Sequence, residues 1–63
     1  MAPIQYLNRF RIDQAKRLLT TSDKAVGEIG RLVGVPDPGY FCRLFRKLAG
    51  ETPESYRKKQ RHP

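Results

Sequence analysis

Several features that would define other classes of protein are scarce in this sequence of 63 residues. One cysteine allows no internal disulfide and no cysteine metal cluster, which favours a reducing compartment. The longest apolar runs are dipeptides and tripeptides, far too short to span a membrane, and no charged-then-apolar leader supports secretion. With 38% hydrophobic residues the chain can build one small core, so an enzyme with a deep, dry pocket is not expected.

Acidic residues are also few compared with basic ones. The sequence has 13 Lys and Arg against 6 Asp and Glu, a formal net charge of +7. An excess of this size favours a polyanionic partner, and nucleic acid before a membrane. No predicted helix face carries paired acids, and no Ser–His or Cys–His arrangement is in prospect, so we expect no catalytic residue, no cofactor and no metal. The composition therefore predicts a small, basic, cytosolic binding module.

Proline marks the start of three predicted helices, because it pre-sets the helical φ and lacks an N–H that would stay unpaired there. Pro38 follows Asp37 and Pro53 follows Thr52, both good N-cap residues, and Gly50 suits a left-handed C-terminal position. No segment alternates apolar and polar residues in the manner of a strand. We therefore predict an all-α fold of four helices, at residues 3–20, 26–33, 38–49 and 53–60, with a disordered tail at 61–63.

The segment 38–49 divides most clearly into two faces. Its apolar residues form one helical stripe, the side expected to face the core: Phe41, Leu44, Phe45 and Leu48. The opposite side is small near its start and cationic further on, with Gly39, Cys42, Arg43 and Arg46, flanked by Tyr40 and Lys47. This helix is therefore predicted to present an exposed basic face.

The segment 3–20 has apolar residues on two sides. A broad inner stripe comprises Ile4, Leu7, Ile12, Ala15, Leu18 and Leu19. Arg11 falls within that stripe, and it is either paired with a carboxylate or packs its stem while its guanidinium reaches water. Tyr6 and Phe10 project from the far side, where the sequence supplies no obvious second neighbour.

A very short turn separates the second and third predicted helices. Gly30 permits the two helices to cross closely, Gly34 makes the turn, and Val35 fills the corner before Pro36. This is the arrangement of a helix-turn-helix, whose second helix enters the major groove of DNA by the N-terminal half of its exposed face. The segment 26–49 is therefore predicted to be a helix-turn-helix with 38–49 as its recognition helix.

Many spaced residues together resemble the C-terminal part of the DNA-binding domain of AraC/XylS-family bacterial transcription regulators. They are residues 3–7, Arg11, Ile12, Ala15, Leu18, Leu19, 28–30, 33–35, 40–47, Gly50, Thr52, Pro53, Tyr56 and Arg57. The resemblance implies a homeodomain-like helical bundle, with 3–20 as linker helix, 26–49 as the second helix-turn-helix and 53–60 as the closing helix. It implies sequence-specific binding of double-stranded DNA by a transcription activator of the bacterial cytoplasm, associated with the nucleoid.

The resemblance also implies parts that this sequence does not include. Family domains have two helix-turn-helix units, and here the first is missing. A separate ligand-sensing domain is expected in a longer chain, and RNA polymerase is a further expected partner. Tyr6 and Phe10 are then expected to dock the missing unit, with rings that are exposed in its absence.

The family pattern also points to a base-reading set of Pro38, Gly39, Cys42 and Arg43. Some members have polar residues at the first two positions, which here are Pro38 and Gly39. Base reading is therefore expected to rest mainly on Arg43, which can make a bidentate contact to guanine. Cys42 can add an apolar or weak contact.

The remaining assignments concern phosphate contacts and the motif itself. Tyr40, Arg46 and Lys47 are expected to contact phosphates. Gly30 and Val35 stand where the family commonly has Ala and Phe, and these smaller side chains are expected to keep the motif but loosen its packing.

A protein-interaction or dimerisation module, which docks through exposed apolar residues without reading DNA, is the alternative function. Salt separates the two, because phosphate contacts weaken steeply with salt and an apolar interface changes little. Tyr56 is expected in the core. The basic run 57–61 is expected to be a solvated face that adds non-specific attraction to DNA, and His62 to belong to the disordered tail.

Overall fold

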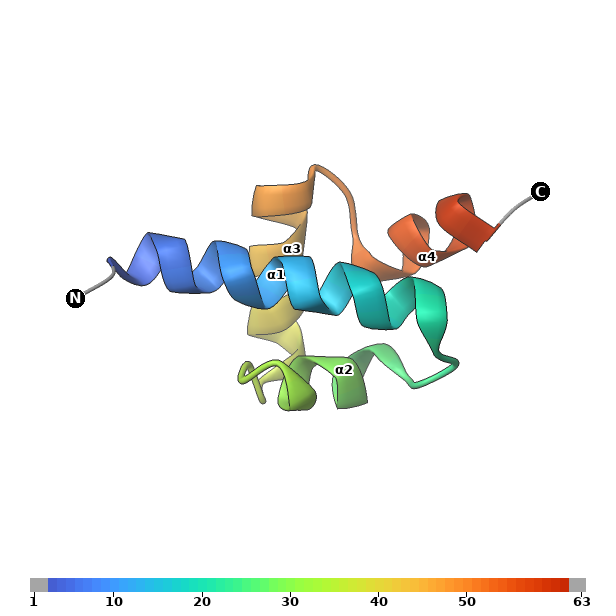
Figure 1. Cartoon of the computed structure of the whole chain (residues 1–63), viewed down its shortest axis with the longest axis horizontal. Helices are drawn as coiled ribbons and strands as arrows, with labels where there is room; N and C mark the ends of the chain where they lie inside the picture. Colours follow the sequence, from blue (N-terminus) through green and yellow to red (C-terminus); the bar gives the residue numbers. More distant parts are fainter. Residues whose placement is uncertain (1–2, 62–63) are drawn as a thin grey trace.

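The computed structural model describes residues 3–61, which form four helices and no strand (Figure 1). They are α1 (Ile4–Thr21), α2 (Val26–Leu32), α3 (Pro38–Ala49) and α4 (Pro53–Arg61). In Figure 1, α1 lies across α3, while α2 and α4 pack beside them at the lower and right-hand sides. The prediction of an all-α, four-helix fold is confirmed.

The predicted capping residues act at the helix ends as expected. The Asp37 carboxylate accepts hydrogen bonds from the Gly39 and Tyr40 amides at 3.0 and 3.4 Å, so it caps α3. Thr52 Oγ1 accepts from the Ser55 amide at 3.2 Å at the start of α4. Gly50 ends α3 with φ +87°, a left-handed conformation that favours glycine.

Four helix ends differ from the prediction by one residue. α1 begins at Ile4 and continues through Thr21, since Pro3 is its N-cap and not its first helical residue. α2 ends at Leu32, and Val33 belongs to the turn. α4 continues through Arg61, so the predicted disordered tail is wrong for that residue. His62 and Pro63 lie outside the described residues.

One core holds the helices together. Its buried residues are Ile12, Ala15, Leu19, Ile29, Val35, Phe41, Leu44 and Phe45. The rings of Phe41 and Phe45 meet edge to face with centroids 6.0 Å apart, and Tyr56 of α4 meets Phe45 in the same way at 5.6 Å. Tyr56 is half-buried against this core, as the sequence predicted.

The inner stripe predicted for α1 continues only part of the way along the helix. Ile4 and Leu7, both expected to face the core, are 71% and 40% exposed. The N-terminal half of α1 extends beyond α3 (Figure 1), and no other helix among residues 3–61 covers these two side chains. Tyr6 and Phe10 are exposed on the far side, as expected.

Arg11 has no carboxylate partner within the described residues, so the first of its two predicted arrangements is wrong. It takes part in none of the ion pairs within residues 3–61, and it is half-buried. Its guanidinium lies against the turn after α2, where a Cβ built on Gly34 would come within 3.2 Å of Arg11 Nε. The guanidinium itself therefore lies against this turn.

The basic run 57–61 is not simply a solvated face. Arg57 donates hydrogen bonds to backbone carbonyls at the end of α1 and in the segment that follows it. Arg61 Nη1 donates to Asp23 Oδ1 at 2.7 Å. These two arginines attach α4 to the connection between α1 and α2, because each guanidinium finds oxygen acceptors there. Lys58 and Lys59 are exposed.

Candidate nucleic-acid interface

The turn between α2 and α3 is tightly closed around Gly30. The Val35 amide donates to the Gly30 carbonyl at 2.7 Å. A Cβ on Gly30 would lie 2.9 Å from the Val35 carbonyl oxygen and 3.0 Å from Phe41 Cγ, closer than side chains pack. The expectation that Gly30 loosens the packing of the motif is therefore wrong. The turn and α3 lie so close to Gly30 that no space remains for a methyl group.

Gly34 and Val35 complete the turn as the sequence predicted. Gly34 has φ +96°, which a side chain would strain. Val35 is 3% exposed, so it fills the corner between the helices. The three residues assigned to the motif therefore have the steric roles expected of them.

The two faces of α3 differ as the helical spacing predicted. Phe41, Leu44 and Phe45 are buried, and Leu48 packs against the core. The other side carries the predicted interface residues, of which all but the half-buried Cys42 are exposed: Pro38, Gly39, Tyr40, Arg43, Arg46 and Lys47. The small residues lie toward the start of α3 and the cations toward its middle and end. This order leaves room at the N-terminal half for close approach of another molecule.

The cations of α3 are not neutralised within the described part of the chain. The ion pairs there are Lys16–Asp13, Lys24–Glu28, Lys59–Glu51 and Arg61–Asp23. Arg43, Arg46 and Lys47 belong to none of them. Exposed, unpaired cations on one helix give the surface a positive potential that attracts anions.

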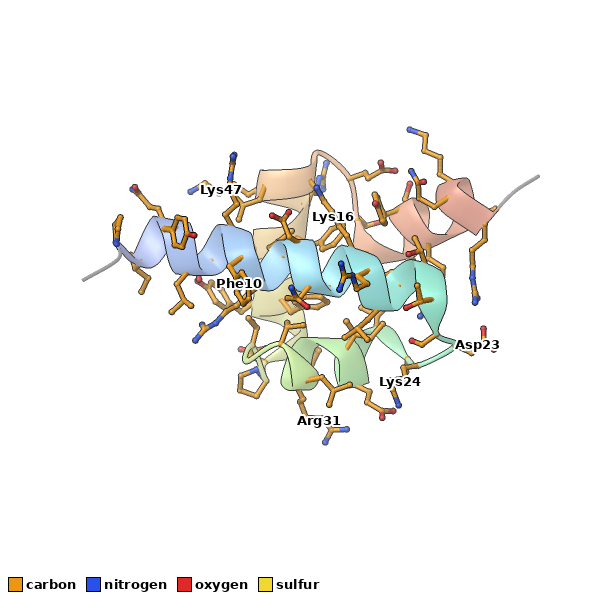
Figure 2. All side chains as sticks on the ribbon, viewed as in Figure 1. Phe10, Lys16, Asp23, Lys24, Arg31 and Lys47 are labelled. Carbon is orange, nitrogen blue, oxygen red and sulfur yellow. The ribbon has the colours of Figure 1, made fainter. Side chains whose placement is uncertain are left out.

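Lys47 stands slightly apart from the other two cations. It lines an open groove of about 440 Å³ between α3 and the N-terminal half of α1, together with Tyr6 and Arg9. Figure 2 shows Lys47 beside this half of α1, at the opposite end of α3 from α2. The cationic surface of α3 therefore continues onto α1 at Arg9.

Arg31 of α2 is a candidate that the sequence reasoning did not select. It is exposed, and it lines a second groove with Pro36 and Pro38 beside the start of α3. Figure 2 shows it projecting from α2 away from α1. In the sequence, Arg31 lies off the apolar side of 26–33, which indicated that it is exposed. The sequence did not indicate that the start of α3 lies beside it.

Neither a candidate metal site nor a membrane-spanning helix occurs among the described residues. Among residues 3–61, no three His, Cys, Asp or Glu side chains gather where they could hold a metal ion. Within the same range, none of the helices has the length and apolar character needed to cross a membrane.

The closed turn, the capped helix after it and the cationic outer face define a helix-turn-helix domain of the DNA-binding class. A family model described as a helix-turn-helix domain, of the AraC/XylS type, matches residues 1–59. The chain belongs to this family.

Two curated relatives are bacterial transcription regulators. The chain is 45% identical over 58 residues to the uncharacterized HTH-type transcriptional regulator YisR of Bacillus subtilis, covering 92% of this chain and 20% of the relative. It is 37% identical over 54 residues to the bifunctional transcriptional activator/DNA repair enzyme AdaA of the same organism, covering 86% and 26%. The chain thus spans about a fifth to a quarter of these relatives.

A solved structure has the same fold. The DNA-binding domain of the global transcriptional factor AdpA, crystallised with a target DNA, matches with a TM-score of 0.86 and 38% identity. The match covers 97% of this chain and 58% of the AdpA chain. The likeness therefore extends over all four helices.

Proposed function

We propose that this chain binds double-stranded DNA with sequence preference, as part of a bacterial transcription regulator, with α3 in the major groove. The observation that carries the proposal is the exposed face of α3, which is small at its start and bears unpaired cations beyond it. A recognition helix needs this combination, because its N-terminal half approaches base edges while cations contact phosphates. The AdpA domain, solved with a target DNA, supports the same partner.

Within this proposal Arg43 has the leading part in base recognition. It is the first exposed arginine along α3, and its planar guanidinium can bind guanine by two hydrogen bonds. Pro38, Gly39 and Cys42 supply a low, mostly apolar surface against the bases. Tyr40, Arg46 and Lys47 contact phosphates, and Arg31 joins them from α2.

The proposal extends to parts outside this chain. The relatives are four to five times longer than the region matched here, which leaves room for a first helix-turn-helix unit and a ligand-sensing domain. We place the unit against Tyr6 and Phe10, whose rings are 65% and 53% exposed. RNA polymerase as a further partner, a location with the bacterial nucleoid and the absence of enzymatic activity belong to the same proposal.

The experiment that tests DNA binding measures the affinity of the chain for randomised duplexes as a function of salt. The logarithm of the affinity should fall linearly with the logarithm of the salt concentration. Arg46→Ala should reduce the magnitude of that slope by about one, the contribution of one phosphate contact, and leave base preference unchanged. Lys58→Ala, at an exposed position of α4, is the control for loss of one positive charge and should reduce the slope less than Arg46→Ala does.

Base reading is tested separately with Arg43→Ala. The variant should lose about 1–3 kcal/mol of binding free energy and relax the preference at one base pair of the selected sequences. A binding titration measures the affinity, and selection of duplexes from a randomised library, followed by sequencing, measures the preference. An unchanged affinity and an unchanged base preference would show that Arg43 does not read a base pair.

An alternative function is a protein-interaction module, favoured by the apolar side chains that α1 and α2 leave exposed. Phe10 and Leu32 lie on the rim of an open groove of about 330 Å³ together with Leu18 and Val33. If this groove is the main binding surface, partner binding should change little with salt. Absence of duplex binding at low salt would favour this alternative over DNA binding.

A further inference from the structure

Outside the interface, Arg57 of α4 makes three hydrogen bonds to backbone carbonyls. Its Nε donates to the Leu19 carbonyl at 3.1 Å, and its Nη2 donates to the Ser22 carbonyl at 3.2 Å and the Lys24 carbonyl at 2.6 Å. These acceptors lie 33 to 38 residues earlier in the chain. One planar guanidinium therefore holds the end of α1 and most of the segment leading to α2.

The carbonyls that Arg57 binds would otherwise lack helical partners. Leu19 belongs to the last turn of α1, where backbone carbonyls have no intrahelical donor. Ser22 and Lys24 lie in the connection after it, and Arg57 is itself half-buried against them. A guanidinium supplies a fork of donors with fixed geometry, which a lysine ammonium does not reproduce.

Arg61 strengthens the attachment one turn further along α4. It binds Asp23, the residue between the Ser22 and Lys24 carbonyls, with 2.7 Å between Nη1 and Oδ1. Figure 2 shows Asp23 at the end of the molecule where α4 and this connection meet. Residues of α4 thus bind Ser22, Asp23 and Lys24 of the connection from α1 to α2.

The helix that follows this connection has little stability of its own. α2 has seven residues, two of them glycine, and its N-cap Ala25 has no side-chain capping bond. Helices this short do not persist without tertiary contacts. Val26 of its first turn packs against the core, and the position of that turn also depends on what holds the connection before it, while Gly30 fixes its far end against α3.

We propose that Arg57 is a positioning residue for DNA binding, holding the start of α2 where the first helix of a helix-turn-helix meets the phosphate backbone. The inference rests on the proposed function. In such domains the first helix crosses the backbone while the second enters the groove. Arg57 acts through the segment it binds and not through its own charge on the DNA. Its loss weakens binding to all duplex sequences alike and leaves the base preference intact.

The test compares Arg57→Gln, Arg57→Lys and the matched control Lys58→Gln in the 63-residue chain. Arg57→Gln should lower the affinity for randomised duplexes by about tenfold, with the same selected sequence as the parent chain. Arg57→Lys should bind nearly as weakly, because the charge is kept but the fork is lost. Lys58→Gln makes the same charge change as Arg57→Gln on the same helix and should bind within about twofold of the parent.

Amide hydrogen exchange supplies a readout that does not depend on DNA. The Ile29 amide, bonded to the Ala25 carbonyl, should exchange faster in both Arg57 variants, while the Phe45 amide in the core keeps its protection. Full binding by Arg57→Lys would overturn the proposal, since charge alone would then suffice. Equal loss of protection at Ile29 and Phe45 would also overturn it, since Arg57 would then support the whole fold.

The failures of the two proposals can be told apart. If the parent chain binds no duplex at low salt, the proposed function fails whatever Arg57 does. If the parent binds and Arg57→Gln binds equally well, the positioning role fails and the proposed function stands.

Discussion

At the scale of single residues, Gly30 and Gly27 show that glycine can be required by packing at one position of a helix and not at another. A Cβ at Gly27 would have no atom of a neighbouring element within 4 Å, whereas a Cβ at Gly30 would overlap the Val35 carbonyl oxygen at 2.9 Å. Helical spacing placed Gly30 on the inner side, and the close approach of another helix was the reason predicted for it. The sequence supplied no reason for Gly27, and the structure supplies none either.

These two positions make a matched pair of substitutions. Gly27→Ala should raise the free energy of unfolding by about 0.5–1 kcal/mol, because alanine favours the helix and meets no obstacle. Gly30→Ala should lower it by about 1–2 kcal/mol, because the strain of overpacking exceeds the same helical gain. Urea unfolding followed by circular dichroism measures both. Stabilisation by both substitutions would contradict the closed packing around Gly30.

At the scale of elements, α3 is the helix whose ends and faces are encoded most completely in its own sequence. Asp37, Pro38 and Gly50 mark its two ends, and its apolar stripe is regular. These signals are local: a cap bonds to amides two and three residues away, and a stripe depends on helical periodicity alone. The predicted bounds 38–49 therefore equal the observed ones.

The cap of α3 gives a prediction at this scale. Asp37→Ala removes the acceptor of the Gly39 and Tyr40 amides and should lower the free energy of unfolding by about 0.5–2 kcal/mol. Asp37→Asn keeps an acceptor oxygen and should recover most of that loss. Thermal unfolding should separate the two, since 1 kcal/mol corresponds to about 4–8 °C in a domain of this size. Equal melting temperatures for the two variants would show that the cap adds nothing measurable.

At the scale of the whole molecule, contacts between α4 and the connection from α1 to α2 join residues far apart in sequence. The Arg61 guanidinium, by its hydrogen bond and then by its charge, lowers the pKa of the Asp23 carboxyl below its ordinary value of 3.8. A carboxyl whose pKa is lower when folded stabilises the protein above its unfolded pKa. That stabilisation is lost as the pH falls through the folded pKa, below 3.8.

Asp23→Asn should therefore remove a small part of the acid sensitivity of the fold. Near neutral pH the variant should be slightly less stable than the parent chain, and the difference should shrink as the pH falls below 3.8. The effect is small because the pair is exposed and screened by salt. Urea unfolding at a series of pH values measures it. A difference that grows toward acid pH would contradict the ion pair.

The exposed half of α1 also belongs to this scale. The molecule measures 40 × 19 × 19 Å, and α1 extends past the other helices. Helical spacing correctly put Ile12, Ala15 and Leu19 in the core, but it also put Ile4 and Leu7 there. The apolar pattern of a helix indicates which residues lie on the same side. It does not indicate how much of the length of the helix a neighbouring helix covers.

The sequence by itself determined the helical class, the number and approximate bounds of the helices, the turn chemistry and the basic face of α3. All of these depend on interactions between residues close in the chain, which propensity, capping and periodicity describe. Tertiary structure alone decided which half of α1 is covered, how closely α2 approaches α3 at Gly30, and that Arg57 and Arg61 bind the connection before α2. Those features depend on distances between helices, and a sequence pattern carries no information about distances across more than 30 residues.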